Sequence, residues 1–302
     1  IFHNKMVFRL GPINTDNGVI STLKNKGHYQ ASTTQKIDFI TSYNDYSRTA
    51  ETIDNKHIKH ERIINYLKND GVFIVFDIVK SLKEKNTITA ANLWHTQNII
   101  DSSSNWYLTN YKSIGKWQNT GNEKLLLIFP ETLDKTISTD NIERHHQKEK
   151  CIAQTRTVVL NKGETECFIT VLVPVGKEDY TSISENYESL ITNTLVGIRA
   201  IIGDKEHYIA HKINLEQDIE RNWPRPKYTY NAGKISAFGY ESDASHFYVK
   251  ESKTSTSFYA LNCTKFIKKE KVLFEQMKNS NEFRPDNDTL TADAWKVRRV
   301  EK

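Results

Sequence analysis

Short segments rich in β-branched and aromatic residues recur along the 302-residue chain, separated by clusters of Asn, Asp, Gly, Ser and Lys. This pattern is typical of antiparallel sheets, in which successive side chains point to opposite faces. We predict strands at residues 36–43, 47–53, 57–67, 72–80, 87–96, 124–129, 153–160, 166–173, 195–202, 207–213 and 245–249. The predicted fold class is therefore all-β, a large antiparallel β-sandwich with few short helices.

The clearest hairpin joins residues 57–67 to residues 72–80. Turn-forming residues separate the two arms, and among them Gly71 can adopt a positive φ without steric cost. The second arm is apolar almost throughout, which is typical of a central strand covered on both faces. Because Arg62 and Asp77 lie on opposite arms, we expect a structural cross-strand ion pair between them.

Few segments carry a helical signal. Residues 141–150 are polar and charged, and they predict an exposed turn or a short helix. Residues 178–190 have room for one helical turn, and residues 266–277 fit either structure, with a strand favoured at their start. No internal repeat or low-complexity linker is present, so we expect residues 1–302 to form a single large β-sandwich domain. The chain begins at Ile1 without a leader, and we expect it to be the C-terminal part of a longer protein.

The composition and the net charge exclude some classes of protein and of binding partner. The hydrophobic fraction of 37% supports a substantial core, and no run approaches the ~20 apolar residues of a membrane-spanning helix. The formal charge of +5 is compatible with an acidic polysaccharide as a partner, but an ordinary mixed surface is the favoured interpretation. No stripe of Arg and Lys is interleaved with stacking aromatic residues, so we do not expect nucleic acid as a partner.

The histidines and cysteines form no local metal-binding pattern. His57 and His60 are three positions apart in a predicted strand, which directs them to opposite faces. His95 follows Trp94 on another strand. It either faces a cleft, where it binds a carboxylate or acts as a base, or is a hydrogen-bonded core residue. We expect free thiols at all three cysteines, with Cys167 buried in an apolar strand; a pairing of Cys151 with Cys263 is the alternative.

One loop-like segment combines aromatic rings with cations. It reads Trp-Pro-Arg-Pro-Lys-Tyr over residues 223–228, and it is too rich in proline for a central strand. Rings of this kind cover the apolar faces of sugars, while cations meet carboxylates; an ordinary packed loop is the alternative. Further aromatic candidates are Trp106, Tyr107, Tyr111, Trp117 and Tyr230. The predicted substrate-binding residues are Trp223, Arg225, Lys227, Tyr228 and His95.

The order of residues from Tyr43 to Val79 resembles the start of the C-terminal β-domain in heparinase II/III-like polysaccharide lyases. In that family a tyrosine-bearing strand precedes an arginine-led apolar strand, a tight turn and a strand ending in an aspartate. Arg62 and Asp77 match the arginine and the aspartate, and His95 matches a histidine on a later strand. The likeness covers about a quarter of the chain, and the rest matches only as an all-β pattern.

The resemblance implies an enzyme family that cleaves acidic polysaccharides by β-elimination, with a tyrosine and a histidine as acid and base. It implies an N-terminal α-helical toroid domain as a partner, which supplies the tyrosine and one histidine, and a periplasmic or secreted location. It also implies a zinc or calcium ion, although no cofactor is identifiable from the residues themselves. The family's His-rich junction motif is not found, because residues 1–10 contain only His3.

We therefore expect this chain to form one wall of a cleft for a uronate-containing polysaccharide and to be inactive alone, with no catalytic residue assigned. One alternative is a self-standing, non-catalytic carbohydrate-binding or scaffold module. Another is a complete enzyme that draws a Tyr and a His from the β-fold itself, since β-elimination requires only a positioned base, an acid and a group that neutralises the carboxylate.

Overall fold

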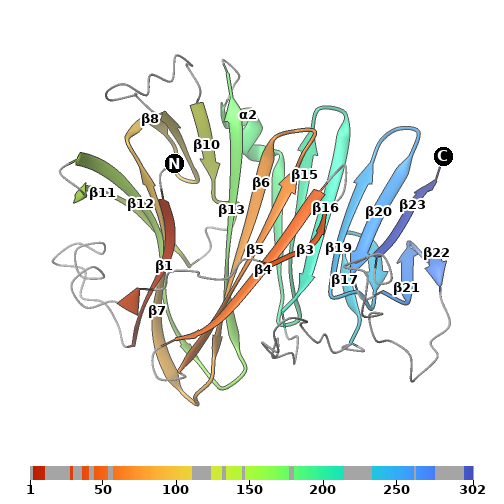
Figure 1. Ribbon diagram of the computed structural model, residues 1–302, viewed down its shortest axis with the longest axis horizontal. Helices are drawn as coiled ribbons and strands as arrows, with labels where there is room; N and C mark the ends of the chain where they lie inside the picture. Colours follow the sequence, from red (N-terminus) through yellow and green to blue (C-terminus); the bar gives the residue numbers. More distant parts are fainter. Residues whose placement is uncertain are drawn as a thin grey trace. The chain divides into compact units, whose positions relative to one another are not determined.

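The computed structural model describes residues 3–10, 28–29, 36–40, 44–53, 57–110, 124–130, 134–144, 147–176, 180–213, 233–261, 263–275 and 296–301. Strands dominate throughout, and the predicted all-β class is confirmed (Figure 1). The chain divides into two compact units, Ile1–Glu185 and Asn186–Lys302; the single domain expected over residues 1–302 stays a prediction. No composition change marks this boundary in the sequence.

The first unit contains two antiparallel sheets. The five-stranded sheet has the order β11 (Thr136–Arg144), β12 (Gln147–Leu160), β7 (Asn86–Thr96), β1 (His3–Leu10) and β2 (His28–Tyr29). The eight-stranded sheet has the order β3 (Lys36–Ile40), β4 (Asn44–Ile53), β5 (Ile58–Leu67), β6 (Val72–Ser81), β13 (Thr165–Val175), β10 (Lys124–Ile128), β9 (Trp106–Asn110) and β8 (Asn98–Ser102). A short helix, α2 (Tyr180–Glu185), follows β13.

Buried side chains from both sheets pack together, which makes the first unit a β-sandwich. One cluster joins Met6, Ile88, Ala90 and Leu160 of the five-stranded sheet to Ile58, Val79 and Phe168 of the eight-stranded sheet. A second joins Trp94 and Ile152 to Val75, Tyr107, Leu127 and Phe129. Asn92 also donates a hydrogen bond to Thr170, from one sheet to the other, over 3.0 Å. The predicted sandwich architecture is thus present in this unit.

The predicted hairpin between β5 and β6 is confirmed. Leu67 pairs with Val72, and the backbone N–H of Asp70 donates to the carbonyl of Leu67 over 3.1 Å. Gly71 adopts φ 69°, a conformation that costs glycine little. β6 lies inside the eight-stranded sheet, and apart from Phe73 and the part-buried Lys80 its side chains are buried on both faces. The predicted central strand, covered on both faces, is therefore confirmed.

The predicted turn or helix over residues 141–150 is wrong. Residues 141–144 belong to β11 and residues 147–150 to β12, and the two strands pair in register from Thr136 opposite Thr155 to Arg144 opposite Gln147. The other side of β12 pairs with β7 over its length. Pairing between segments far apart in the sequence outweighs the local polar signal, because strand preference depends on the neighbouring strands.

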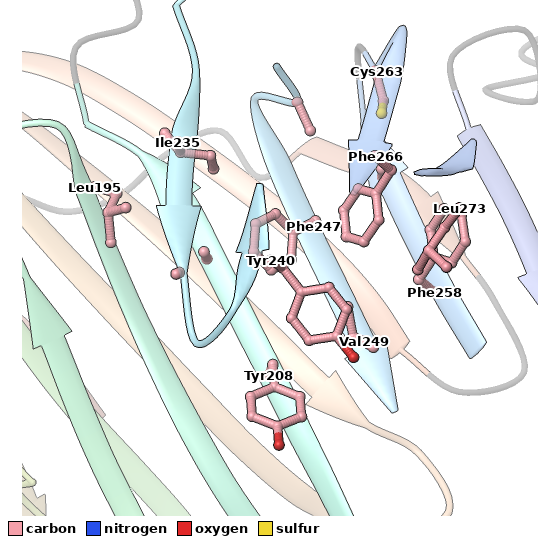
Figure 2. Packing of buried hydrophobic residues seen from close by; sticks show 14 residues of the cluster. Leu195, Tyr208, Ile235, Tyr240, Phe247, Val249, Phe258, Cys263, Phe266 and Leu273 are labelled. Carbon is pink, nitrogen blue, oxygen red and sulfur yellow. The ribbon is translucent and has the colours of Figure 1, made fainter. Parts of the chain in front are cut away.

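The second unit also contains two antiparallel sheets. The six-stranded sheet has the order β14 (Tyr187–Ile191), β15 (Leu195–Ile202), β16 (Lys205–Lys212), β19 (His246–Glu251), β20 (Thr256–Leu261) and β23 (Lys296–Glu301). The four-stranded sheet has the order β17 (Ile235–Ala237), β18 (Tyr240–Ser242), β21 (Lys265–Lys268) and β22 (Lys271–Glu275). An aromatic core joins the two sheets: Tyr240 and Phe266 of the smaller pack with Phe247 and Phe258 of the larger (Figure 2).

The turn between β21 and β22 carries a strained backbone. Its two central residues, Lys269 and Glu270, have φ values of 43° and 72°. Left-handed backbone costs about 1–2 kcal/mol for an ordinary L-residue, whereas Asn-Gly suits a turn with two positive φ values. Replacing Lys269-Glu270 by Asn-Gly is therefore expected to raise the free energy of unfolding by about 1–2 kcal/mol. Urea denaturation of the two proteins measures the difference, and an unchanged or lower stability would contradict it.

Candidate functional site

A row of polar side chains crosses the edge of the eight-stranded sheet. Asn98 of β8 pairs in register with Asn110 of β9, and Asn110 pairs with Lys124 of β10. Residues paired in this way lie on the same face of a sheet. The side-chain amide of Asn98 donates to Oδ1 of Asn110 over 3.3 Å. All three residues are half-buried, so the row is both held in place and open to solvent.

Helix α2 adds an aromatic side chain to this row. The Lys124 ammonium donates to the Tyr180 hydroxyl over 3.1 Å, and Nζ lies 5.7 Å from the centre of the ring. The same hydroxyl donates to the carbonyl of Gly176 over 3.1 Å. These bonds fix Tyr180, at the start of α2, against β10. We name the four residues the Asn-Lys-Tyr surface: Asn98, Asn110, Lys124 and Tyr180.

Trp106 packs against one member of the Asn-Lys-Tyr surface, Tyr180. Its ring centroid lies 6.2 Å from that of Tyr180, and the residue is 5% exposed. The next residue, Tyr107, packs in the sandwich core against Phe129, as expected for neighbours on a strand. Of these two aromatic candidates, only Trp106 contacts the surface, and it does so as a buried support.

The chemistry of the Asn-Lys-Tyr surface suits a polar, anionic ligand. An amide group both donates and accepts hydrogen bonds, as a hydroxyl-rich ligand requires. An ammonium has three donors, and the bond to Tyr180 uses one of them. The phenol ring offers apolar surface beside these polar groups. Sequence reasoning missed Asn98, Asn110 and Lys124, because only the register of two hairpins brings these strand-end residues together.

A second polar cluster lies inside the sandwich of the first unit. Asp77 is fully buried, and its carboxylate accepts two hydrogen bonds from Arg62, over 2.7 and 3.0 Å. His60 Nε2 lies 2.8 Å from the same carboxylate. The predicted cross-strand pair of Arg62 and Asp77 is therefore confirmed, and it is buried. Burial raises the pKa of Asp77, but the charge of Arg62 and the His60 hydrogen bond outweigh it, so the net shift is downward.

His95 lies at 2% exposure on the five-stranded sheet. Its Nδ1 is 3.5 Å from Oε2 of Glu149, and its Nε2 is 3.9 Å from Sγ of Cys151. Cys151 is the residue paired with His95 across β7 and β12, and Glu149 stands two positions earlier on β12. A polymer cannot reach this group in the described conformation, so substrate binding by His95 stays a prediction.

Histidines and tyrosines also gather on the six-stranded sheet. His207 Nδ1 lies 2.9 Å from the Tyr248 hydroxyl, and His211 is paired in register with His246. All four are at most 1% exposed. Burial, followed by the charge of His211, lowers the pKa of His246 well below its usual value, so its imidazole is neutral. We assign these residues no acid–base role, because a polysaccharide chain cannot contact them.

The segment Trp223, Arg225, Lys227 and Tyr228 lies outside the described residues, as do Tyr111, Trp117 and Tyr230. Within the described part of the chain, no group of three or more His, Cys, Asp or Glu side chains is placed to hold a metal ion. The three cysteines are free and buried, as expected. No helix among the described residues is both long and apolar enough to cross a membrane.

Comparison with known proteins identifies no family. No family model matches the chain, and no curated protein matches it. A solved structure described as a heparinase III gene product is similar over 59% of this chain, with 15% sequence identity and a TM-score of 0.40. The match spans 27% of that protein's length, about a quarter of it. Similarity at this level does not establish a shared function.

Proposed function

We propose that this chain is the β-sandwich portion of a heparinase II/III-like polysaccharide lyase, and that it binds a uronate-containing polysaccharide on the Asn-Lys-Tyr surface. The observation that carries the proposal is a half-exposed row of two amides and a cation, with a phenol ring beside it, on one face of a sheet. The order of residues from Tyr43 to Val79 supports the family, as does the all-β fold.

Each part of this surface has a partner on an acidic sugar chain. Lys124 would bind the uronate carboxylate through a charge-assisted hydrogen bond. Asn98 and Asn110 would bind hydroxyl groups, and Tyr180 would contact C–H groups. Neighbouring strands lie about 4.8 Å apart, so the three-strand row is about 10 Å long. A ligand of repeated units suits such a row better than a single small molecule.

The segment from Trp223 to Tyr228 is a second proposed contact for the same polysaccharide. Its two rings would cover sugar faces, and Arg225 and Lys227 would meet carboxylates or sulfates. Its two prolines restrict the chain, so less conformational entropy is lost when a ligand binds. Both proposed contacts rely on charge pairing, and affinity should therefore fall as the ionic strength rises past ~0.15 M.

Replacing Lys124 by methionine is expected to weaken polysaccharide binding roughly 5- to 10-fold, the equivalent of losing about 1–1.4 kcal/mol. Titration calorimetry with alginate measures the affinity. Lys253→Met is the matched control, because Lys253 is an exposed lysine in the turn after β19, in the second unit. Equal affinity of Lys124→Met and the unmodified protein would show that the polysaccharide does not bind on the Asn-Lys-Tyr surface. Equal weakening by both variants would show unspecific charge attraction.

Replacing Trp223 and Arg225 together by alanine is expected to weaken binding of the same ligand without unfolding the protein. The reason is the loss of one ring and one bidentate cation. Calorimetry gives the affinity, and circular dichroism checks the fold. Unchanged affinity would leave Lys124 and its neighbours as the binding site, and loss of the fold would show that Trp223 is a core residue.

The chain alone is expected to show no elimination activity. In the family it resembles, an acid–base tyrosine and one histidine come from a separate helical domain, and the buried histidines described above cannot replace them. The test is the ultraviolet absorbance of an unsaturated uronate, with heparan sulfate and alginate as substrates. Sustained turnover would contradict the expectation and would favour a complete enzyme within the β-fold.

A further inference from the structure

Cys151, His95 and Glu149 form a linear array on the five-stranded sheet. Sγ of Cys151 and Nε2 of His95 are 3.9 Å apart, within reach of a sulfur hydrogen bond. The other ring nitrogen, Nδ1, lies 3.5 Å from the Glu149 carboxylate. A carboxylate beside Nδ1 favours the tautomer with its proton there, and this leaves Nε2 as the acceptor for the thiol proton. The thiol, the imidazole and the carboxylate thus follow one another as nucleophile, base and orienting group, with the Nδ1–carboxylate distance longer than that of a normal hydrogen bond.

The other two cysteines provide an internal comparison. All three are buried, at 0% exposure for Cys151, 1% for Cys167 and 3% for Cys263. Burial, followed by the charge of Glu166, raises the pKa of the Cys167 thiol far above its usual range. Burial raises the pKa of the Cys263 thiol to about 12, and its sulfur contacts Ser242 and the Lys265 carbonyl. The described contacts place an imidazole against Cys151 and against neither of the others.

We propose that Cys151 is a nucleophilic thiol, activated by His95 and oriented through Glu149, and that it takes small, soft carbon electrophiles. The thiol proton moves to Nε2 of His95, and the sulfur forms a bond to the electrophilic carbon. With iodoacetamide the C–I bond breaks, iodide leaves with the bonding electron pair, and the imidazolium later returns its proton to water. Because all three thiols are buried, each reacts through a local opening that admits the reagent. An opening that keeps His95 against Cys151 favours this thiol over the other two. This inference is independent of polysaccharide binding.

The test is alkylation of the folded full chain by iodoacetamide, followed by peptide mass mapping of the three cysteines. At pH 7 Cys151 is expected to react at least about 10-fold faster than Cys167 and Cys263. Its rate should rise less steeply with pH than the rates of the other two cysteines, because His95 takes the thiol proton as the bond to carbon forms. A thiol without such a partner would gain about 10-fold per pH unit between pH 6 and 8.

Two variants distinguish activation of the Cys151 thiol by His95 and Glu149 from simple access of the reagent to that thiol. His95→Asn is expected to slow alkylation of Cys151 at least about 10-fold while the rates of Cys167 and Cys263 stay unchanged. Glu149→Gln should slow it less, because the imidazole remains. Equal rates at the three cysteines in the unmodified protein would overturn the proposal. So would a Cys151 rate that is the same with and without His95, in a protein whose circular dichroism shows an intact fold.

Discussion

Replacing Asp77 by alanine is expected to lower the free energy of unfolding by about 3–5 kcal/mol. Asp77 is fully buried between β5 and β13 and accepts hydrogen bonds from Arg62, with His60 against the same oxygen. Removing the carboxylate leaves the Arg62 guanidinium, itself largely buried, without its partner. Breaking one side of a buried ion pair costs more than the pair contributes, because the remaining charge is left in the core.

Urea denaturation followed by tryptophan fluorescence measures this loss. Asp101→Ala is the matched control, since Asp101 is an exposed aspartate on β8 of the same sheet, and a change of no more than about 0.5 kcal/mol is expected there. A loss below about 1 kcal/mol in Asp77→Ala would contradict the account, because that magnitude is typical of an exposed ion pair.

The stabilising effect of Asp77 should also depend on pH. The pKa of Asp77 in the folded protein is lower than its unfolded value of about 3.9. Its stabilising effect is therefore complete above the unfolded pKa and is lost as the pH falls through the folded pKa. The difference in unfolding free energy between the unmodified protein and Asp77→Ala should be constant near neutral pH and narrow below about pH 4.

Replacing Phe266 by alanine is expected to cost about 3–5 kcal/mol in the second unit. Phe266 is fully buried, stacks on Phe258 at 4.5 Å with an interplanar angle of 5°, and meets Phe247 edge-on at 5.2 Å. Tyr240 lies 5.7 Å away on the neighbouring strand. The substitution removes the ring that joins the four-stranded sheet to the six-stranded sheet and leaves a cavity between them (Figure 2).

Thermal and urea denaturation of Phe266→Ala measure the effect. Val272→Ala on β22 is the comparison, because Val272 is 45% exposed and its loss should change stability by no more than about 0.5 kcal/mol. A similar small change for Phe266→Ala would show that the sheets of the second unit are held together by other contacts.

The parts of the fold that were predictable from sequence are those with strong local signals. The β5–β6 hairpin has turn chemistry at Gly71 and a continuous apolar arm, so its position and the Arg62–Asp77 pairing follow from the sequence. The burial of that pair does not follow, because it depends on the five-stranded sheet that covers β6. The strands within residues 141–150 were missed for the same reason, since β12 gains its stability from β7, more than fifty positions away.

The candidate sites depend still more on pairing between distant segments. Trp106 was singled out for its ring, yet the half-exposed polar groups of the Asn-Lys-Tyr surface are Asn98, Asn110 and Lys124, none of which is unusual in the sequence. Only the register of β8, β9 and β10 brings them into one row. His95 and Cys151 are 56 positions apart and become neighbours in the same way. Residue type suggested which side chains to consider, and strand register decided which of them meet.

The most direct test of the central claim compares two forms of one polymer. Alginate carries a carboxylate on every sugar, and reducing those carboxyl groups to hydroxymethyl groups leaves a neutral chain of the same backbone. The unmodified protein is titrated calorimetrically with both at low ionic strength, where charge pairing is least screened. We expect measurable binding of the acidic polymer and at least 10-fold weaker binding of the reduced one, because the lost charge-assisted contact is worth about 1.4 kcal/mol or more. Equal affinity for the two polymers, or no binding of either, would contradict it.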